Sequence, residues 1–562
     1  MGRLTGFTVR NFRSIGDPVQ IRLPSQGPLV LLGENNAGKS NLVRALDIVL
    51  GDTWPTSFHP EDHDFYERDR DCLPMEVILD VSGINRYRYE SATPIKQFRW
   101  CFDPAADADR HCVFEAVLHN DQRYWARTEE RTQLCSVIVG ADRRLSYELS
   151  YTSKWTMLSK LMRKFHERLV ADPGRVDRLK ERFSDVVEIF REVEEFTTFS
   201  DELRNMAATF AANLQYGLDL DFSAYDPSNY FRSLRVNPTL REDVRSFDEL
   251  GTGQEQILAV AFAYAYARAY GSGDDGLVMV IEEPEAHLHP IAQRWLAKKV
   301  AGLHGDAVQV IVTTHSPAFV DLANPGGIAL IRKPGQAGAT MVVQHGRPGL
   351  AAEMSKTGAP ATATSVGAFY SASATAEHVE GLFARACLVV EGPTEVLALP
   401  ELLLGAGLDV LECGIAVVSA GGIGGIARWL RLYRAYGLPC YVTFDRDTKD
   451  DKEGVKRADL LRVLGEDVGS YEMALEGAGS LVVTSDYAVA VADFEESLRS
   501  LFPNYSDFEA QAKMAGAVSK PLVAREACKA LRRDLDASGW ASIRELADAI
   551  STILPASRSV AA

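Results

Sequence analysis

Apolar and polar positions alternate along the first 50 residues in a way that predicts two strands followed by a helix. Residues 6–12, GFTVRNF, alternate as a half-buried strand does, and residues 28–32, PLVLL, form the continuous apolar run of a buried strand. Residues 41–50, NLVRALDIVL, have helical spacing. The pattern therefore predicts the start of an α/β nucleotide-binding domain, with a glycine-containing turn between the second strand and the helix.

The next part of the chain changes character twice. Between residues 72 and 148, short alternating segments such as MEVILDVSG predict a meander of antiparallel strands. From residue 154 to 212 the pattern becomes helical and rich in charge, which indicates an inserted helical segment. Such an insertion is either a place where two chains meet or a solvated helical hairpin without a partner.

A strand, helix, strand rhythm returns in residues 276–317, from GLVMVIEEPE to VQVIVTTHSP. A stretch rich in small residues, about 335–375, separates it from a second α/β pattern that ends in helices after about Asp493. We therefore expect residues 1–150 and 216–370 to form one domain, 151–215 to form a helical insertion, and 380–562 to form a second α/β domain.

Composition restricts the function classes. The chain has 562 residues, 46% of them hydrophobic, and its net charge of -17 argues against coating nucleic acid through bulk charge, so any DNA contact must be local. The 8 cysteines form no CxxC pair, which favours a reduced, intracellular protein. Neither a signal-peptide core nor an apolar run of about 20 residues is present, so we expect a cytoplasmic protein without a membrane partner.

The octapeptide GENNAGKS, residues 33–40, matches the phosphate-loop pattern GxxxxGK[ST] between the predicted strand and helix. In such a loop glycines let backbone N–H groups close around phosphate oxygens, Lys39 supplies positive charge, and Ser40 ligates magnesium. The sequence therefore predicts an ATP site. The residues expected at the nucleotide are Gly33, Asn35, Asn36, Gly38, Lys39, Ser40 and Asn41.

The second half of an ATP site should be an apolar strand that ends in carboxylates, and LVMVIEE provides one. We expect Glu282 to hold magnesium through water and Glu283 to polarise the attacking water. His315 follows the next strand, where it could reach the γ-phosphate. His287 and His289 resemble a metal pair, but we expect a structural role because no third ligand is close in sequence. The acidic turn FHPEDHDF, residues 58–65, is expected to be solvated, and a loop that lies over the nucleotide is the alternative.

The segment LGTGQEQ, residues 250–256, places Gly251, Gly253 and Gln254 before a long helix. It resembles the signature segment of ABC-type ATPases. Phosphate loop, signature, carboxylate strand and histidine follow in the order found in the SMC and RecF-like branch of those ATPases. The resemblance implies two ATP sites shared between two chains, and therefore a homodimer.

The C-terminal half carries a second set of acids. An apolar strand ends at Glu391, Glu395 follows four residues later, and another apolar strand ends at Asp445 and Asp447. Because parallel strands deliver their C-terminal ends to one edge of a sheet, these carboxylates should converge. Like charges repel when they are close, and divalent cations such as Mg²⁺ or Mn²⁺ are suitable partners for hard oxygen ligands. The pattern predicts a metal site.

This arrangement, VEGPTE followed by a DxD strand end, resembles the Toprim fold, and an ABC-type ATPase followed by Toprim resembles the OLD (overcoming lysogenization defect) nuclease family, including the nuclease subunit of Gabija-type antiphage systems. The resemblance covers nearly the whole chain. It implies metal-dependent nicking or cleavage of DNA, with Glu391, Glu395, Asp445 and Asp447 as ligands. It also implies a later acid, for which Glu495 is the candidate and Glu496 the rival, and a lysine that stabilises transition-state charge, for which Lys520 is the candidate.

The expected cofactors are thus ATP and Mg²⁺, with Mn²⁺ or another divalent ion as an alternative at the Toprim site. The expected partners are DNA, a second copy of the chain and a helicase-like protein, in antiphage defence or DNA repair. The alternative hypothesis is an SMC-like or RecF-like repair ATPase whose Toprim-like domain binds DNA without cutting it. The glycines of SAGGIGGI, residues 419–426, either let the backbone approach a DNA phosphate or permit a tight turn.

Overall fold

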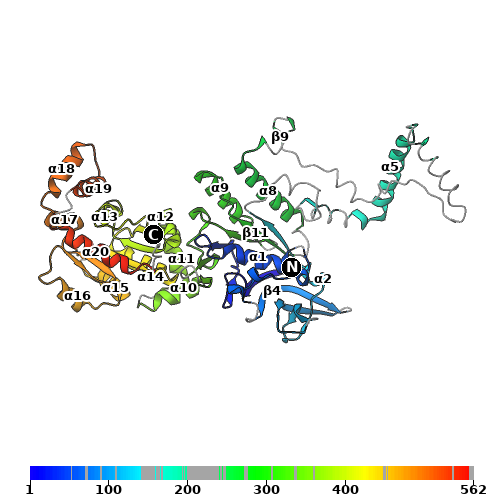
Figure 1. The fold of residues 1–562 in the computed structure, drawn as a ribbon, viewed down its shortest axis with the longest axis horizontal. Helices are drawn as coiled ribbons and strands as arrows, with labels where there is room; N and C mark the ends of the chain where they lie inside the picture. The colour runs from blue at the N-terminus through cyan, green and yellow to red at the C-terminus, as the bar shows by residue number, and fades with distance from the viewer. Residues whose placement is uncertain are drawn as a thin grey trace. The chain divides into compact units, whose positions relative to one another are not determined.

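The computed structural model divides the chain into two compact units, residues 1–138 with 271–562, and residues 139–270. Each unit is described by itself (Figure 1). None of the described helices combines the length and hydrophobicity that crossing a lipid bilayer requires. The structure describes residues 1–51, 53–69, 74–88, 91–107, 110–140, 158–159, 162, 165, 169–192, 194, 197–198, 201, 239–240, 243–244, 249–270, 276–305, 308–333, 338–358, 361–446, 451, 453–533 and 537–555.

An antiparallel sheet of six strands forms one layer of the larger unit, in the order β2-β1-β4-β5-β6-β7. The alternating segments between residues 72 and 148 supply β4 to β7, so the expected meander is confirmed. Its strands alternate buried and exposed positions, as expected for a sheet with one face on the core. The strands are β1 (Arg3–Arg10), β2 (Val19–Arg22), β4 (Met75–Arg88), β5 (Ser91–Phe102), β6 (Cys112–Leu118) and β7 (Arg123–Trp125).

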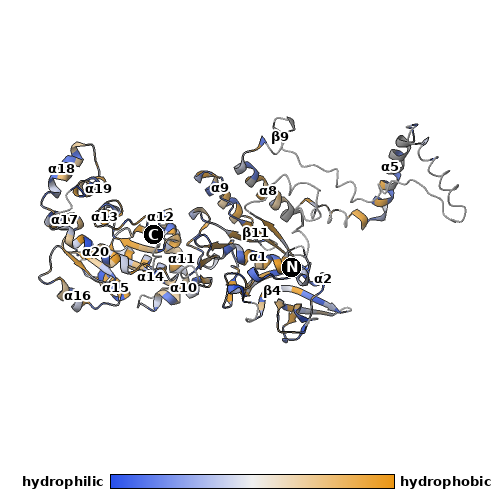
Figure 2. Cartoon of the chain, viewed as in Figure 1, coloured by the Kyte–Doolittle hydropathy of each residue, from blue (hydrophilic) through white to orange (hydrophobic). Residues whose placement is uncertain are grey.

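A second sheet has the order β14-β13-β3-β12-β11-β8, and its central strands are parallel. These strands are almost wholly buried and hydrophobic, as a sheet covered on both faces requires (Figure 2). The pairing of Thr313 with both Leu31 and Glu282 brings the ends of three strands to one edge. The strands are β3 (Leu29–Leu32), β8 (Leu134–Val139), β11 (Gly276–Glu282), β12 (Val308–Thr313), β13 (Ile328–Arg332) and β14 (Met341–Gln344).

Helices α1 (Lys39–Leu50), α2 (Thr128–Arg131) and α9 (Pro290–Ala301) accompany these sheets. In the smaller unit, the described elements are α5 (Pro173–Arg191), β9 (Thr239–Leu240), β10 (Asp243–Val244) and α8 (Thr252–Tyr270). Helix α5 lies inside the expected helical insertion. The domain boundaries expected from the sequence, and a dimerisation role for the insertion, remain predictions.

The C-terminal half contains a third sheet, ordered β16-β15-β17-β19-β18, in which all strands except β18 run parallel. Because β15 and β17 are direct neighbours, with Val390 opposite Thr443, the residues that follow them meet at one edge. The strands are β15 (Ala386–Val390), β16 (Ile415–Ser419), β17 (Cys440–Asp445), β18 (Leu481–Val483) and β19 (Tyr487–Ala490).

Helices surround this sheet, and those after residue 493 were expected from the sequence. Helix α13 packs beside α19 and α20, and their apolar side chains share a buried core with the sheet. The helices are α10 (Arg347–Ser355), α11 (Ala363–Ser373), α12 (Ala376–Glu380), α13 (Pro393–Gly405), α14 (Ile423–Ala435), α15 (Val455–Leu464), α16 (Val468–Leu475), α17 (Phe494–Leu501), α18 (Tyr505–Met514), α19 (Lys520–Leu531) and α20 (Trp540–Thr552).

The end of α14 contacts the hairpin formed by β13 and β14. Arg332 donates a hydrogen bond to the carbonyl of Gly437 at 2.7 Å, and His345 Nε2 lies 2.8 Å from the carbonyl oxygen of Ala435. The rings of His345 and Tyr436 meet edge to face at 5.4 Å. The sheet that contains β13 and the C-terminal sheet are therefore directly joined through α14.

A buried arginine fixes α14 to its neighbours. Arg431 donates two hydrogen bonds to Asp459 on α15, at 2.9 and 2.6 Å, and a third to Thr357 Oγ1 at 2.7 Å. Its side chain is 5% exposed, so its charge depends on this carboxylate.

We predict that Asp459→Ala lowers the free energy of unfolding by about 3 kcal/mol, the lower end of the range for a broken buried pair, because Asp459 itself is partly exposed. Chemical denaturation of both proteins measures the difference. Glu353→Ala, which removes an exposed pair with Lys356, is the control and should change nothing measurable. Equal midpoints for Asp459→Ala and the parent would contradict the assignment.

Candidate functional sites

The phosphate loop closes around its own lysine. Lys39 is buried, and its Nζ donates to the carbonyl oxygens of Gly33 at 2.8 Å and Glu34 at 3.0 Å. Glycine is required at two positions of the loop, because neighbouring atoms lie too close to where a Cβ would be. A Cβ on Gly33 would lie 2.2 Å from the Ile331 carbonyl oxygen, and one on Gly38, whose φ is 113°, would lie 2.4 Å from Thr340 Oγ1. The loop therefore has the tight backbone path that phosphate binding needs.

The acidic strand end lies across from this loop, as expected. Burial lowers the pKa of Lys39 to about 8, and the negative charges of Glu283 and Glu285 oppose this shift. A bound nucleotide would provide further negative charge beside Lys39 and favour its protonated form.

Glu283 and His315 are brought together by the parallel pairing of β11 and β12. Glu283 has a left-handed backbone with φ of 45°, which its N–H stabilises by donating to the Thr313 carbonyl oxygen at 2.9 Å. His315 Nε2 lies 3.7 Å from Glu283 Oε1, and the His315 backbone N–H donates to the Glu285 carboxylate. Burial, followed by the charge of Lys39, lowers the pKa of His315. The histidine is thus positioned at the acidic edge of the site.

Sequence reasoning did not single out Glu285, which here orients His315. The EEPE run contained it, but the strand pattern pointed to the first two acids. His289 has the structural role that was expected, because it is the N-cap of α9 and its side chain accepts from the Ala292 N–H. The signature residues Gly251, Gly253 and Gln254 belong to the smaller unit, at the start of α8. Their role at a nucleotide remains a prediction.

The carboxylates predicted for the second site come from four elements around the edge of the C-terminal sheet. Glu391 Oε2 accepts from the Asp445 N–H at 3.1 Å, and Glu395 Oε2 accepts from the Gly392 N–H at 3.1 Å. Glu495 Oε2 lies 2.9 Å from Lys520 Nζ. Asp447 lies outside the described residues. Each of the three described glutamates is therefore held by a donor of the protein itself.

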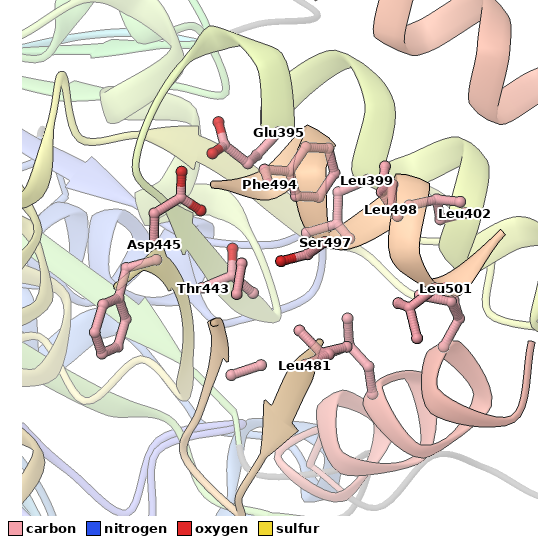
Figure 3. Close-up of a pocket in the computed structure, with 15 residues that line it drawn as sticks. Glu395, Leu399, Leu402, Thr443, Asp445, Leu481, Phe494, Ser497, Leu498 and Leu501 are labelled. Carbon is pink, nitrogen blue, oxygen red and sulfur yellow. The ribbon is translucent and has the colours of Figure 1, made fainter. Parts of the chain in front are cut away.

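The charges of these acids affect one another's pKa values, which shows that the acids lie close together. Burial, followed by the charges of Glu395 and Glu391, raises the pKa of Asp445 to about 8. Burial likewise raises the pKa of Glu395 to about 7, with contributions from Glu391 and Glu495. Figure 3 shows the carboxyl groups of Glu395 and Asp445 near each other at one end of a cavity. When its carboxyl groups are deprotonated, the cluster has excess negative charge that a cation would neutralise.

The donor set fits a hard divalent ion, because all its members are carboxylates. Among the described residues, no group of three or more His, Cys, Asp or Glu side chains is already arranged to hold a metal ion. Glu391, Glu395 and Glu495 each direct one carboxylate oxygen to a donor of the protein. The ligand assignments remain predictions.

The structure distinguishes the two candidates for the late acid. Glu495 is 4% exposed and contributes to the raised pKa of Asp445, whereas Glu496 is exposed. Burial lowers the pKa of Lys520, but its hydrogen bond with Glu495, together with the negative charges of Glu495, Asp493 and Asp445, outweighs that effect, and the net shift is upward. Lys520 is thus charged and beside the acids, as its proposed role requires.

The glycine run has a conformational role. Gly421 and Gly422 have φ of 70° and 108°, and the Gly422 N–H donates to the Glu391 carbonyl oxygen at 2.7 Å. These angles favour glycine, so the tight-turn interpretation is supported. The space where their Cβ atoms would be is open, so the approach of a phosphate to this backbone stays a second interpretation.

Comparisons with known proteins match two separate stretches of the chain. Residues 88–320 match the family "AAA ATPase domain", and residues 382–447 match "Overcoming lysogenization defect protein-like, TOPRIM domain". The chain is 28% identical to the OLD nuclease of Thermus scotoductus (strain ATCC 700910 / SA-01) over 456 residues, which cover 78% of this chain and 81% of that protein.

Solved structures with some likeness include the Smc head domain of Pyrococcus furiosus bound to the C-terminal domain of ScpA, with a TM-score of 0.37 and 16% identity over 62% of this chain and 97% of that one. Stu0660 of Streptococcus thermophilus has a TM-score of 0.37 and 11% identity over 62% of this chain and 79% of that one.

We predict a pH-dependent stability for the metal-free protein. The pKa of Asp445 is about 8 in the folded protein, and its ordinary value, expected for the unfolded chain, is 3.8. Between these two pH values the folded state therefore binds more protons than the unfolded state. The contribution of Asp445 to stability is therefore present below about pH 4 and is lost as the pH rises to about 8. The melting temperature of Asp445→Asn relative to the parent should rise through this window and level off above it. A difference that does not vary with pH would contradict the shift.

We predict that Lys39→Ala abolishes nucleotide binding, because the loop loses the charge that faces the phosphates. Titration with a fluorescent ATP analogue measures this, and Mn²⁺ titration should show the second site intact. Glu283→Gln is the matched variant: it should still bind the analogue but hydrolyse ATP more slowly. ATP hydrolysis at the parental rate by Lys39→Ala would show that the phosphate loop is misplaced.

Proposed function

We propose that this chain, which joins an ATPase domain to an OLD-like TOPRIM domain as its motifs predicted, is a DNA endonuclease that binds and hydrolyses ATP and cuts with divalent metal ions. The chain is similar to a nuclease, and the match covers 81% of that protein. This similarity supports the enzyme class. The single observation that carries the proposal is the gathering of buried acids, two with strongly raised pKa values, at the edge shared by β15 and β17.

In this proposal the C-terminal acids hold the ions. Glu391 and Asp445 are held at neighbouring strand ends, Glu395 begins α13, and Glu495 approaches from α17. Divalent ions, when bound there, supply positive charge that activates water and stabilises the leaving oxygen of a phosphodiester. Mg²⁺ is the expected ion, with Mn²⁺ as an alternative.

The lysine of this centre is proposed to stabilise negative charge on the DNA phosphate. Lys520 is 67% exposed at its side chain and is held beside Glu495, so it can meet a DNA phosphate that approaches from solvent. Its positive charge would stabilise negative charge that develops on the phosphate during cleavage. Asp447 completes the proposed ligand set.

The ATPase site is proposed to work through separate residues. Lys39 and the loop backbone bind the phosphates, Ser40 and Glu282 hold magnesium, and Glu283 orients the attacking water with His315 beside it. The signature segment around Gly251 would complete the site on a second copy of the chain, which makes a homodimer the expected assembly. Antiphage defence or DNA repair, with a helicase-like partner, is the proposed context.

We predict that the parent protein nicks supercoiled plasmid in Mg²⁺ or Mn²⁺ and that Glu391→Ala and Asp445→Ala each reduce the rate by at least about 100-fold, more than is typical for residues outside a ligand set. Agarose-gel analysis of the plasmid measures nicking. The matched pair Glu495→Ala and Glu496→Ala tests the late acid, because the first residue is buried in the cluster and its neighbour is exposed.

The result also decides between the two functions. If the parent and both alanine variants retain DNA equally and none of them nicks it, the non-nucleolytic repair ATPase is the better description. Nicking that is lost in Glu496→Ala and kept in Glu495→Ala would reverse the assignment of the late acid.

A further inference from the structure

A small cavity lies next to the acidic cluster. Its volume is about 30 Å³, and Glu395 and Asp445 line one end of it. The remaining wall is mainly apolar, with leucines from α13 and α17 and with Ile543 and Leu546 from α20. Two hydroxyl groups, on Thr443 and Ser497, also line it (Figure 3). The cavity therefore has a polar end, next to the acids, and an apolar end.

Both hydroxyl oxygens are buried without a hydrogen-bond partner among the described residues. Thr443 is 9% exposed and Ser497 is 4% exposed, and neither Thr443 Oγ1 nor Ser497 Oγ has a partner there. The same holds for Glu495 Oε1, whose other oxygen is paired with Lys520. Three buried polar atoms near one cluster thus have unused hydrogen-bonding capacity.

A buried polar atom without a hydrogen-bond partner costs about 1–3 kcal/mol, so two hydroxyl oxygens and one carboxylate oxygen in one region call for an explanation. A water molecule requires roughly 10–15 Å³ of such space and two to four polar partners. The cavity meets the first requirement for one or two waters, and its polar end meets the second. Its apolar end provides no partners and would stay dry.

The two hydroxyl groups are placed by the same elements that place the acids. Thr443 precedes Asp445 by two residues on β17, so both side chains lie on one face of the sheet. Ser497 follows Glu495 by two residues on α17. Water bound between the hydroxyls would therefore join the strand that carries one acid to the helix that carries another.

We propose that the cavity binds ordered water that hydrogen-bonds Thr443, Ser497 and the adjacent carboxyl groups, and that Thr443 and Ser497 are thereby positioning residues of the nuclease centre. This inference rests on the proposed function, in which the ion bound by the acids is a divalent metal ion. Neither residue touches DNA or the ion. Their effect is to hold in place the strand and the helix that carry the carboxylates.

The test compares Thr443→Val, Ser497→Ala and the double variant as full-length proteins. Direct Mn²⁺ titration without DNA is the first measurement. Each single variant should bind Mn²⁺ about 10-fold more weakly, within the range for residues that orient metal ligands. The double variant should lose little more than either single one, because both hydroxyls act through the same water. Plasmid nicking should need correspondingly more Mn²⁺.

Two variants control for structural effects. Thr443→Ser keeps the hydroxyl and should restore Mn²⁺ affinity. Ser551→Ala removes a helical serine hydroxyl that bonds to the Ala547 carbonyl, away from the cavity lining, and should leave affinity unchanged. The melting temperature of metal-free Thr443→Val separates the alternatives, since removal of an unpaired hydroxyl from a dry cavity would raise it, whereas removal of a water ligand would not.

Parental Mn²⁺ affinity in both single variants, together with a raised melting temperature for Thr443→Val, would overturn the inference. So would a high-resolution crystal structure with no water within about 3 Å of either hydroxyl. The proposed function fails separately, if the parent binds Mn²⁺ with the expected response to these variants but does not nick DNA. A parent that binds no Mn²⁺ would overturn both.

Discussion

The crowding of carboxyl groups at the edge of the C-terminal sheet is the constraint on which the proposed nuclease centre depends. The parallel neighbours β15 and β17 end side by side, so Glu391 and Asp445 are forced together by the pairing of the apolar residues before them. Burial, with the charges of neighbouring carboxylates adding to its effect, raises the pKa values of Asp445 and Glu395 and so favours their protonated forms in the metal-free protein. Binding of a cation would release those protons and convert a destabilising cluster into a ligand set.

At the acidic edge near the phosphate loop, the positive charge of a lysine offsets the repulsion between carboxylates. There too parallel strands bring acids together, but Lys39 projects among them and its charge interacts with Glu283 and Glu285. In the C-terminal centre, Lys520 is paired with Glu495 at the rim, while Asp445 and Glu395 keep their raised pKa values. This difference is consistent with the proposal that the first site binds an anionic nucleotide and the second binds a cation.

The sequence predicted those features that depend on strand ends. Apolar runs followed by acids located Glu283 and Asp445, and the glycine pattern located Lys39, because local periodicity fixes where a strand stops. It could not predict Thr443 or Ser497, since their importance arises from a cavity that three-dimensional packing creates. The acidic turn at residues 58–65 was expected to be solvated, which is wrong for Asp64: it is buried and paired with Arg13 at 3.0 Å. That partner is 51 residues away, and no local pattern indicates it.

Helix α14 gives the two centres a physical connection. It follows the Gly422 N–H that bonds to Glu391, and just beyond its end Gly437 accepts a hydrogen bond from Arg332 on β13. Strand β13 pairs in turn with β3, which leads into the phosphate loop. Contact of this kind supplies a route, whereas coupling requires that nucleotide and metal favour different positions of a shared element. The buried Arg431 and its bonds to Asp459 and Thr357 hold α14 to α15 and to the end of α10, so these helices would have to move together.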